Sequence, residues 1–341
     1  MAVVRADWPR ARPRKRPVWL VLSLAVLAAL VLLSVTVGAR AVSADEVFAG
    51  LTGNARTVGE AAVGVRLPRT VLAVVIGASL ALAGTVMQGV TRNPLADPGI
   101  LGVNTGASLA VVTGMAWFGL SAAVSTMWVA VAGAAVAAVF VYVVGSLGRG
   151  GATPLKLALA GAASSAAFAS LVTAVSLPRG DIAEGVRSWQ IGGVGGATFD
   201  RIVQVLPFLV VGALLCAATA KGLNTLALGD ELAAGLGERV AITRAVAATG
   251  AVLLCGAATA VAGPIGFVGL VVPHAYRLLV GTDHRWLLPF SAVGGAVLLV
   301  AADVVGRVIA RPEEIDVGIV TAIVGAPVFI AIIRRKKVRT L

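Results

Sequence analysis

Long uncharged, apolar runs are the feature that most constrains this chain. The clearest extends over residues 70–91, between Arg66-Leu67-Pro68-Arg69 and a second polar segment that contains Asn93, Pro94 and Pro98. A helix of 22 residues, at about 1.5 Å of rise per residue, crosses a hydrocarbon core about 30 Å thick. The prolines of the second segment resist helix continuation. We therefore predict a membrane-spanning helix between two tight polar turns.

Composition and window lengths extend this prediction to the whole chain. Hydrophobic residues make up 58% and charged residues only 13% of 341 residues, which excludes an ordinary soluble globular protein. The uncharged windows are 18–37, 70–91, 98–148, 157–178, 202–220, 245–276, 286–302 and 317–333. The 51-residue window is long enough for two spans, and Gly263-Pro264 divides the window 245–276. We predict an all-α, polytopic membrane protein with ten transmembrane helices.

Basic residues gather at both ends of the chain. The tail 1–17 and the tail 334–341 are rich in Arg and Lys, so the positive-inside rule places both termini in the cytoplasm. With ten crossings, nineteen of the 28 basic residues fall inside and nine outside. This distribution, rather than nucleic-acid binding, accounts for the net charge of +12. The first apolar run is longer than the apolar region of a signal peptide, so we interpret it as the first span.

The chain offers little chemistry of its own. No Lys follows a Gly, so a phosphate loop is absent and any ATP hydrolysis must occur on another chain. Cys216 and Cys255 lie in apolar runs and are expected to be packing residues. The only histidines are His274 and His284, and no ligand cluster indicates a resident metal or cofactor. We predict a non-enzyme whose longest inner segment, 221–244, forms one or two short surface helices.

Asp303 is the most notable acid within an apolar run. It precedes Arg307 by four residues, so on a helix the two side chains share one face. An intramembrane acid could serve a proton-coupled carrier, but the nearby arginine favours a structural ion pair. A membrane enzyme is a weaker alternative, because the spans contain no polar catalytic cluster. A helical channel is also weaker, because it would explain none of the three motifs described next.

Three dispersed motifs carry a resemblance to a known family. The first is Arg66-Leu67-Pro68-Arg69 followed by Asn93-Pro94-Leu95-Ala96-Asp97-Pro98, the second runs from Gly263-Pro264 to Pro273-His274, and the third runs from Ala302-Asp303 to Gly325-Ala326-Pro327. In this order they resemble the permease subunits of the iron-siderophore, haem and vitamin B12 ABC importers. The resemblance implies a type II ABC importer permease, one domain over 1–341, in a bacterial cell membrane. The resemblance also implies a structural role for seven motif residues: Asn93, Pro94, Pro98, Gly263, Pro264, Pro273 and Asp303.

The resemblance also implies roles for individual residues. Arg66, Arg69 and Arg307 would receive acidic residues of an extracytoplasmic binding protein, although interfacial anchoring is the simpler alternative. Gly229, Glu231, Gly237 and Glu238 would couple the segment 221–244 to an ATPase, unless that segment is merely solvated. Five further residues would either line the translocation path or simply let helices pack closely: Gly161, Ser164, Ser165, Gly325 and Pro327.

The function implied is import of an iron(III)-siderophore, with haem or cobalamin as alternative substrates. The expected partners are two copies of a cytoplasmic ATP-binding subunit, a binding protein, the lipid bilayer and a second permease chain, identical or related; nucleic acid is not expected. Glu314-Ile315-Asp316-Val317-Gly318 departs from the family pattern Glu-Leu-Pro-Val-Gly. Without this proline, the turn before the last span need not follow the family's geometry.

Overall fold

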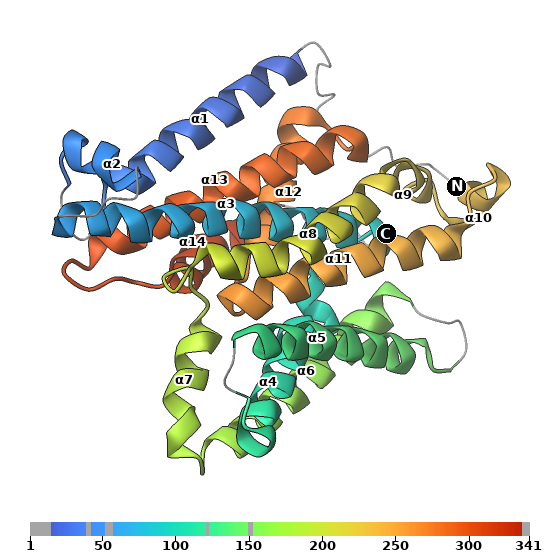
Figure 1. Cartoon of the computed structure of the whole chain (residues 1–341). Coiled ribbons are helices and arrows are strands. Elements are labelled where there is room, and N and C mark those ends of the chain that lie inside the picture. The colour runs from blue at the N-terminus through green and yellow to red at the C-terminus, as the bar shows by residue number, and fades with distance from the viewer. Residues whose placement is uncertain (1–14, 39–41, 52–56, 121–122, 149–152, 336–341) are drawn as a thin grey trace.

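The structure is a computed structural model that describes residues 15–38, 42–51, 57–120, 123–148 and 153–335. These residues form helices joined by short connections, and none of them lies in a strand (Figure 1). The elements are α1 (Arg16–Thr36), α2 (Ala44–Leu51), α3 (Val58–Thr91), the 3₁₀ helix η2 (Pro98–Leu101), α4 (Val103–Phe118), α5 (Ala123–Ser146), α6 (Pro154–Ser176), α7 (Gly180–Ile191), α8 (Phe199–Ala218), α9 (Ala220–Leu226), α10 (Asp230–Gly235), α11 (Val240–Ala262), α12 (Val268–Val280), α13 (His284–Ile309) and α14 (Val317–Arg335). The basic tails predicted at the two ends lie largely outside the described residues.

The pattern of apolar helices agrees with the predicted spans. Among the described residues, seven helices (α1, α3, α5, α6, α8, α11 and α13) are long and apolar enough to cross a membrane. The shorter helices α4, α12 and α14 bring the total to ten, which fits ten crossings. As predicted, the long window divides into α4 and α5, and the break at Gly263-Pro264 separates α11 from α12. The fold is all-α and polytopic.

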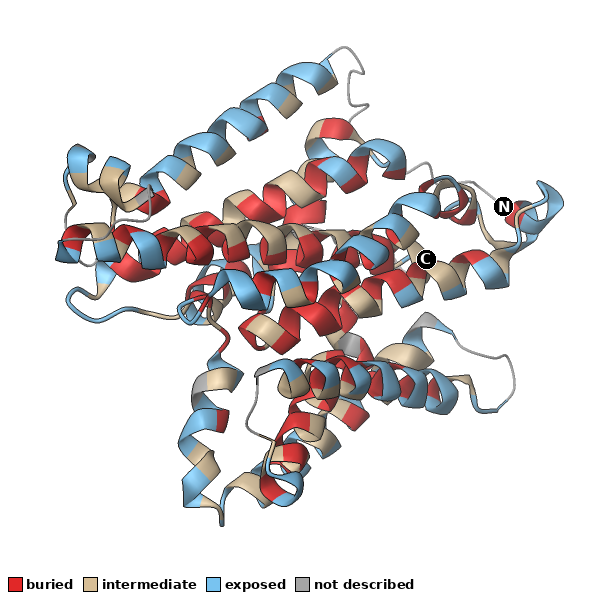
Figure 2. Cartoon of the chain, viewed as in Figure 1, coloured by how far each residue is buried: buried red, intermediate tan, exposed pale blue. Residues whose placement is uncertain are grey.

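Helix α3 lies at the centre of the molecule. In its most apolar window 72% of residues are buried, against 11% for α1, which lies at the edge of the bundle (Figure 2). An added Cβ at Gly77 would lie 2.3 Å from the carbonyl oxygen of Gly295 in α13, and one at Gly84 would lie 2.1 Å from that of Gly269 in α12. Glycines therefore let α3 touch the backbones of two neighbouring helices.

The first polar motif does not form the predicted turn, and this prediction was wrong. Arg66-Leu67-Pro68-Arg69 lies inside α3, which begins at Val58. The helix starts early because Thr57 and Glu60 form a capping box, with hydrogen bonds of 3.1 and 3.2 Å. Pro68 has no N–H to donate to the carbonyl of Gly64, but it is buried within the helix and does not end it.

The second polar segment does form the predicted turn. Arg92 adopts a left-handed conformation (φ 51°) and ends α3. Asn93 Oδ1 then accepts a hydrogen bond from the N–H of Leu95, and Asp97 caps η2, which begins at Pro98. Short side chain to backbone bonds thus turn the chain back into the bundle.

The connections lie at two opposite ends of the bundle. Helix α2 lies at the end predicted to be outside, and α10 lies at the other end (Figure 1). The segment 221–244 contains two short helices, α9 and α10, before α11 begins, as predicted. Cys216 and Cys255 are free and buried, which agrees with their predicted packing role.

Candidate functional site

At the outer end of α3, one buried carboxylate lies between two arginines. Asp303 of α13 pairs with Arg69 Nη2 at 2.8 Å and with Arg307 Nη2 at 2.9 Å. Arg69 also pairs with Glu314, which follows α13, at 2.5 Å. The side chains of Asp303 and Arg307 are each 1% exposed. The ion pair predicted from the i, i+4 spacing is present, and a second helix joins it.

Arg307 and a third arginine, Arg66, bind the end of α1. Arg66 Nη1 donates hydrogen bonds to the carbonyls of Val35 and Thr36 at 3.3 and 3.1 Å. Arg307 Nη1 donates to the carbonyl of Ser34 at 2.9 Å. These are carbonyls of the last helical turn, which lack intrahelical donors and carry partial negative charge. We call Arg66, Arg69, Asp303, Arg307 and Glu314 the outer cluster; it joins α1, α3 and α13.

The structure brings the three predicted docking arginines together but turns them inward. Arg66, Arg69 and Arg307 are only 7, 8 and 1% exposed. Their donors bind carboxylates and helix carbonyls of the same chain. A role for them in contact with a binding protein therefore stays a prediction.

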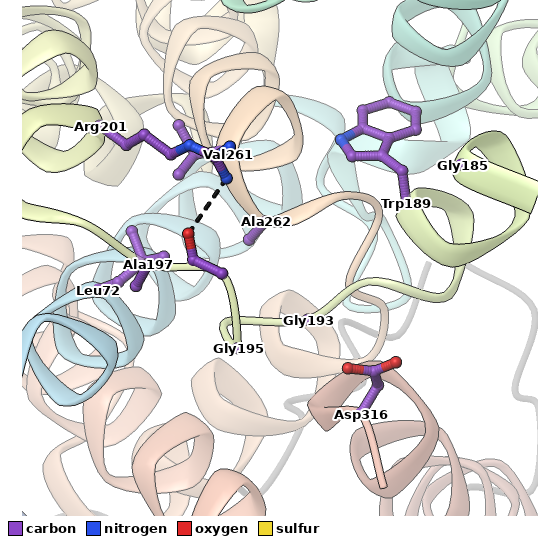
Figure 3. Close-up of a pocket in the computed structure, with 11 residues that line it drawn as sticks. Leu72, Gly185, Trp189, Gly193, Gly195, Ala197, Arg201, Val261, Ala262 and Asp316 are labelled. Atoms are coloured by element: carbon purple, nitrogen blue, oxygen red, sulfur yellow. Dashed lines mark hydrogen bonds between the residues drawn. The ribbon is translucent and has the colours of Figure 1, made fainter. Parts of the chain in front are cut away.

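Figure 3 shows a cavity of about 290 Å³. It lies close to the outer cluster, because an added Cβ at Gly195 in its wall would lie 3.8 Å from Arg69 Nη1. Its wall includes Trp189 of α7, Asp316 before α14, and Arg201 of α8, which donates to the carbonyl of Gly196 at 3.1 Å. Asp316 is half-buried, and this burial raises the pKa of its carboxyl group. Its carbonyl accepts from the N–H of Ile319, so α14 begins normally without the family proline.

The second and third motifs both contact the segment that follows α7, in the wall of this cavity. The N–H of Gly193, just after α7, donates to the carbonyl of Ala262 at the end of α11 at 2.8 Å. The N–H of Gly318 in α14 donates to the carbonyl of Gly192 at 2.9 Å. Gly263 has φ 68° and passes so close to Trp189 that an added Cβ would clash with its carbonyl oxygen at 2.1 Å. The segment after Trp189 therefore fixes the break between α11 and α12.

At the inner end, the segment around α10 presents an apolar face made by three leucines. Leu228 precedes the helix, Leu232 lies in it and Leu236 follows it directly, and their side chains are 57, 63 and 69% exposed. Glu231 is exposed beside them. Gly229 (φ 105°) and Gly237 (φ 85°) bound the helix in conformations that other residues rarely adopt. A cluster of exposed leucines away from the membrane-spanning helices indicates a protein contact surface.

The carboxylate beside this face makes bonds within the chain. Asp230, the first residue of α10, accepts from both terminal nitrogens of Arg244 at 2.9 Å each. Arg92, at the end of α3, pairs with Asp230 at 3.2 Å. Glu238 accepts a hydrogen bond from the hydroxyl of Thr243 in α11. We call Arg92, Asp230 and Arg244 the inner cluster.

The sequence alone did not indicate the inner cluster. The segment 221–244 was predicted only to form one or two short surface helices, with no contact to the end of α3. The only available signal was an acid at a helix N-terminus, which is common. Asp230 lies 138 residues after Arg92 and 14 residues before Arg244, so the contacts among them depend on the tertiary fold.

A second contact ties the inner segment to α13. Asn224 of α9 accepts from the backbone N–H of His284 at 2.8 Å and donates to Asp283 at 2.6 Å. Hydrogen bonds from Arg285 and Asn224 lower the pKa of Asp283 to about 2. Helices α9 and α10 are thus attached to α13, α11 and α3.

Comparison with known proteins decides the family. The sequence pattern of the FecCD transport family matches residues 26–335. The chain belongs to the FecCD transport family. It is 45% identical over 272 residues to the "Probable siderophore transport system permease protein YfiZ" of Bacillus subtilis strain 168, covering 80% of this chain and 81% of that protein. It is 43% identical over 306 residues to the ferric enterobactin transport system permease protein FepD of Escherichia coli K12, covering 89% and 91%.

A solved structure agrees with the fold of this FecCD permease. It is described as an inward-facing metal-chelate type ABC transporter and superposes with a TM-score of 0.81 at 26% identity, covering 94% of this chain and 99% of that one. Other relatives are named as permeases for hemin and for cobalamin. The permease is a multi-pass protein of a bacterial cell membrane, and its family is one of transport proteins rather than catalytic enzymes.

The residues predicted for the path or for packing occupy different environments in the permease. Gly161 and Ser164 are buried in α6, and Ser165 is half-buried. Gly325 is buried against Phe267, whose side chain would lie 2.3 Å from an added Cβ. Pro327 is exposed on α14. Packing thus accounts for Gly325. A translocation path along the exposed faces of α6 and α14 stays a prediction.

Proposed function

We propose that this FecCD permease forms the translocation path of an ATP-driven importer for an iron(III)-siderophore. An extracytoplasmic binding protein would deliver the chelate, two ATP-binding subunits would attach at the inner face, and a second permease chain would complete the path. The three exposed leucines in and beside α10, Leu228, Leu232 and Leu236, are the observation that carries the proposal. Because the chain has no phosphate loop, an energy-supplying partner must contact it from the cytoplasm, and α10 offers an apolar surface for that contact.

Two further observations support the choice of substrate and path. The relatives YfiZ and FepD, at 45 and 43% identity, are both named for siderophores. The exposed side of α6 consists mainly of small residues, such as Ala162, Ala166 and Ser170. A surface of this kind lets a bulky chelate pass without strong binding groups, and a second permease chain would supply the opposite wall.

The residues at the two ends of the bundle have separate roles in such an importer. Gly229, Glu231, Gly237 and Glu238 shape and flank the ATPase-facing helix α10. Arg66, Arg69 and Arg307 lie under the outer surface on which a binding protein would dock, so acidic residues of that protein would meet a region rich in arginine. Haem and cobalamin remain the alternative substrates, since relatives named for both are similar to this chain.

A proton-coupled carrier is the alternative from a different class, and the outer cluster argues against it. An acid that carries protons must exchange them during the cycle. Asp303 is 1% exposed, and its carboxylate lies within 2.9 Å of both Arg69 and Arg307. Protonation would leave both arginines without their partner.

Uptake measurements in cells that lack this gene, with and without its restoration, test the proposal. The cells receive catecholate, hydroxamate and citrate chelates of radiolabelled iron, together with labelled cobalamin and hemin. We expect loss of one iron chelate, restored by the gene and abolished when ATP is depleted. Loss of cobalamin or hemin uptake alone would reassign the substrate. Gene-dependent uptake that persists without ATP but stops when the proton gradient is dissipated would contradict the importer.

A further inference from the structure

Helix α10 is attached to the rest of the chain through its buried residue Ala233 and through the ion pairs of its first residue, Asp230. It is only six residues long, and a glycine with positive φ lies on each side of it, Gly229 before and Gly237 after. Such a helix does not hold its position through its own hydrogen bonds. Of its side chains, Ala233 is buried and Asp230 makes ion pairs, whereas Glu231 and Leu232 are exposed. The position of α10 therefore depends on what Asp230 binds.

Asp230 binds two different helices. The bidentate pair with Arg244 fixes it to the start of α11, at the geometry that makes Arg–carboxylate pairs specific. The pair with Arg92 fixes it to the end of α3. Arg92 is the residue that ends α3 in a left-handed conformation, so its backbone is constrained directly beside the contact.

Helix α3 connects the inner and outer clusters. At 34 residues it is about 50 Å long. Arg92 follows its inner end, and Arg66 and Arg69 lie near its outer end. Between them, Gly77 and Gly84 pack against the backbones of α13 and α12. A displacement of the inner end of α3 must therefore move the helix and its close neighbours together, because tightly packed elements do not deform independently.

We propose that Asp230 is a positioning residue that transmits movement of α10 to α3, and through α3 to the outer cluster. This inference rests on the proposed function, because it takes α10 as the helix that an ATPase moves. The two neighbouring acids then have separate roles. Glu231 faces the partner, and Asp230 faces the chain's own arginines. The ion pairs of Asp230 with Arg92 and Arg244 are partly exposed. They can break and form again in a new geometry without leaving a buried charge unpaired.

The test uses the tagged permease with the ATP-binding subunit that co-purifies with it, reconstituted in liposomes with the binding protein. The cargo is whichever of the three iron chelates shows gene-dependent uptake. Transported iron per ATP hydrolysed is measured for wild type, Asp230→Asn and Arg92→Gln. We expect both variants to lower this ratio by about two- to fivefold, the range expected from losing a partly exposed ion pair.

Three comparisons make the result specific. Arg239→Gln makes the same charge change in the same segment, and Arg239 has no ion pair among the described residues, so this variant should keep the wild-type ratio. The double variant Arg92→Gln/Asp230→Asn should be no worse than either single variant, because both remove one link. The amount of co-purified ATPase reports whether α10 still attaches its partner.

The possible outcomes separate the inference from the proposed function. An unchanged ratio in Arg92→Gln with the ATPase attached would overturn the link through α3. Loss of the ATPase from Asp230→Asn would also overturn it, since Asp230 would then belong to the attachment surface. Failure of the wild-type permease to bring down any ATPase would instead overturn the proposed function.

Discussion

The outer and inner clusters are built from the same groups but in opposite surroundings. Each places one aspartate between two arginines, and each ties α3 to other helices. Asp303 and Arg307 are 1% exposed, whereas Asp230 and Arg92 are 43 and 40% exposed. A buried pair is costly to separate, while a half-exposed pair exchanges protein contacts for water with little loss. The comparison indicates that the outer cluster fixes helix positions and the inner cluster permits movement.

Removal of a buried arginine should have the largest effect. Arg307→Ala leaves Asp303 with one partner and leaves the carbonyls of Ser34 and Val37 without this donor, so we expect a loss of about 3–5 kcal/mol in folding free energy. Thermal unfolding of the purified protein in detergent measures the loss. Arg311→Ala, at an exposed position four residues later, is the control and should change stability little. Equal melting temperatures for the two variants would remove the distinction between the clusters.

A double-mutant cycle should detect coupling within the outer cluster. Arg69→Ala leaves Asp303 paired with Arg307 alone, and Asp303→Ala leaves Arg69 paired with Glu314 alone. The double variant removes both charges of the Arg69–Asp303 pair. We expect a coupling energy of about 0.5–3 kcal/mol, measured from the same unfolding transitions. Additive losses would show that Arg69 and Asp303 stabilise the helices independently, in spite of the 2.8 Å contact.

The inner cluster should contribute less and respond to salt. Asp230→Asn should cost no more than about 1 kcal/mol, because its pairs are partly exposed. Raising the ionic strength should reduce the difference between wild type and variant, since salt screens accessible charges more than buried ones. Unfolding in low and high salt measures this, with Arg307→Ala as a salt-insensitive reference. A loss as large as that of Arg307→Ala would contradict the comparison.

The smallest effect is expected at the edge of the outer cavity. Burial raises the pKa of Asp316, so its charged form destabilises the folded state above the ordinary pKa of about 3.9. Asp316→Asn should therefore stabilise the protein slightly, by about 0.5 kcal/mol, at neutral pH. The gain should vanish as the pH falls below about 4, where the carboxyl group is protonated in both states. Melting curves from pH 4 to 8 measure this; a gain that grows in acid would contradict the pKa shift.

The sequence predicted the helical spans because their physical requirement is local. A run such as 70–91 is long and uncharged whatever surrounds it, and Gly263-Pro264 breaks a helix by its own backbone preferences. The start of α3 was missed because a capping box at Thr57 and partners for Arg66 and Arg69 outweighed the local signal of Pro68. Those partners lie in α1, in α13 and after α13.

The candidate sites show the same division. The Asp303–Arg307 pair follows from helical spacing, so the sequence predicted it. The contacts from Asp303 to Arg69 and from Arg92 to Asp230 join residues 234 and 138 positions apart, and no periodicity indicates them. The burial of the three outer arginines was also unpredictable, since their acceptors include backbone carbonyls of α1.

The close approach of Gly77 and Gly84 to neighbouring backbones has a consequence for how this protein can evolve. Even a single methyl group at either position would occupy the place of another helix's carbonyl group. These two sites are therefore closed to all other amino acids unless α12 or α13 shifts. Sequence change is then confined to surfaces away from this seam, such as the exposed sides of α6 and α14, where side chains can be exchanged without disturbing the packing of α3.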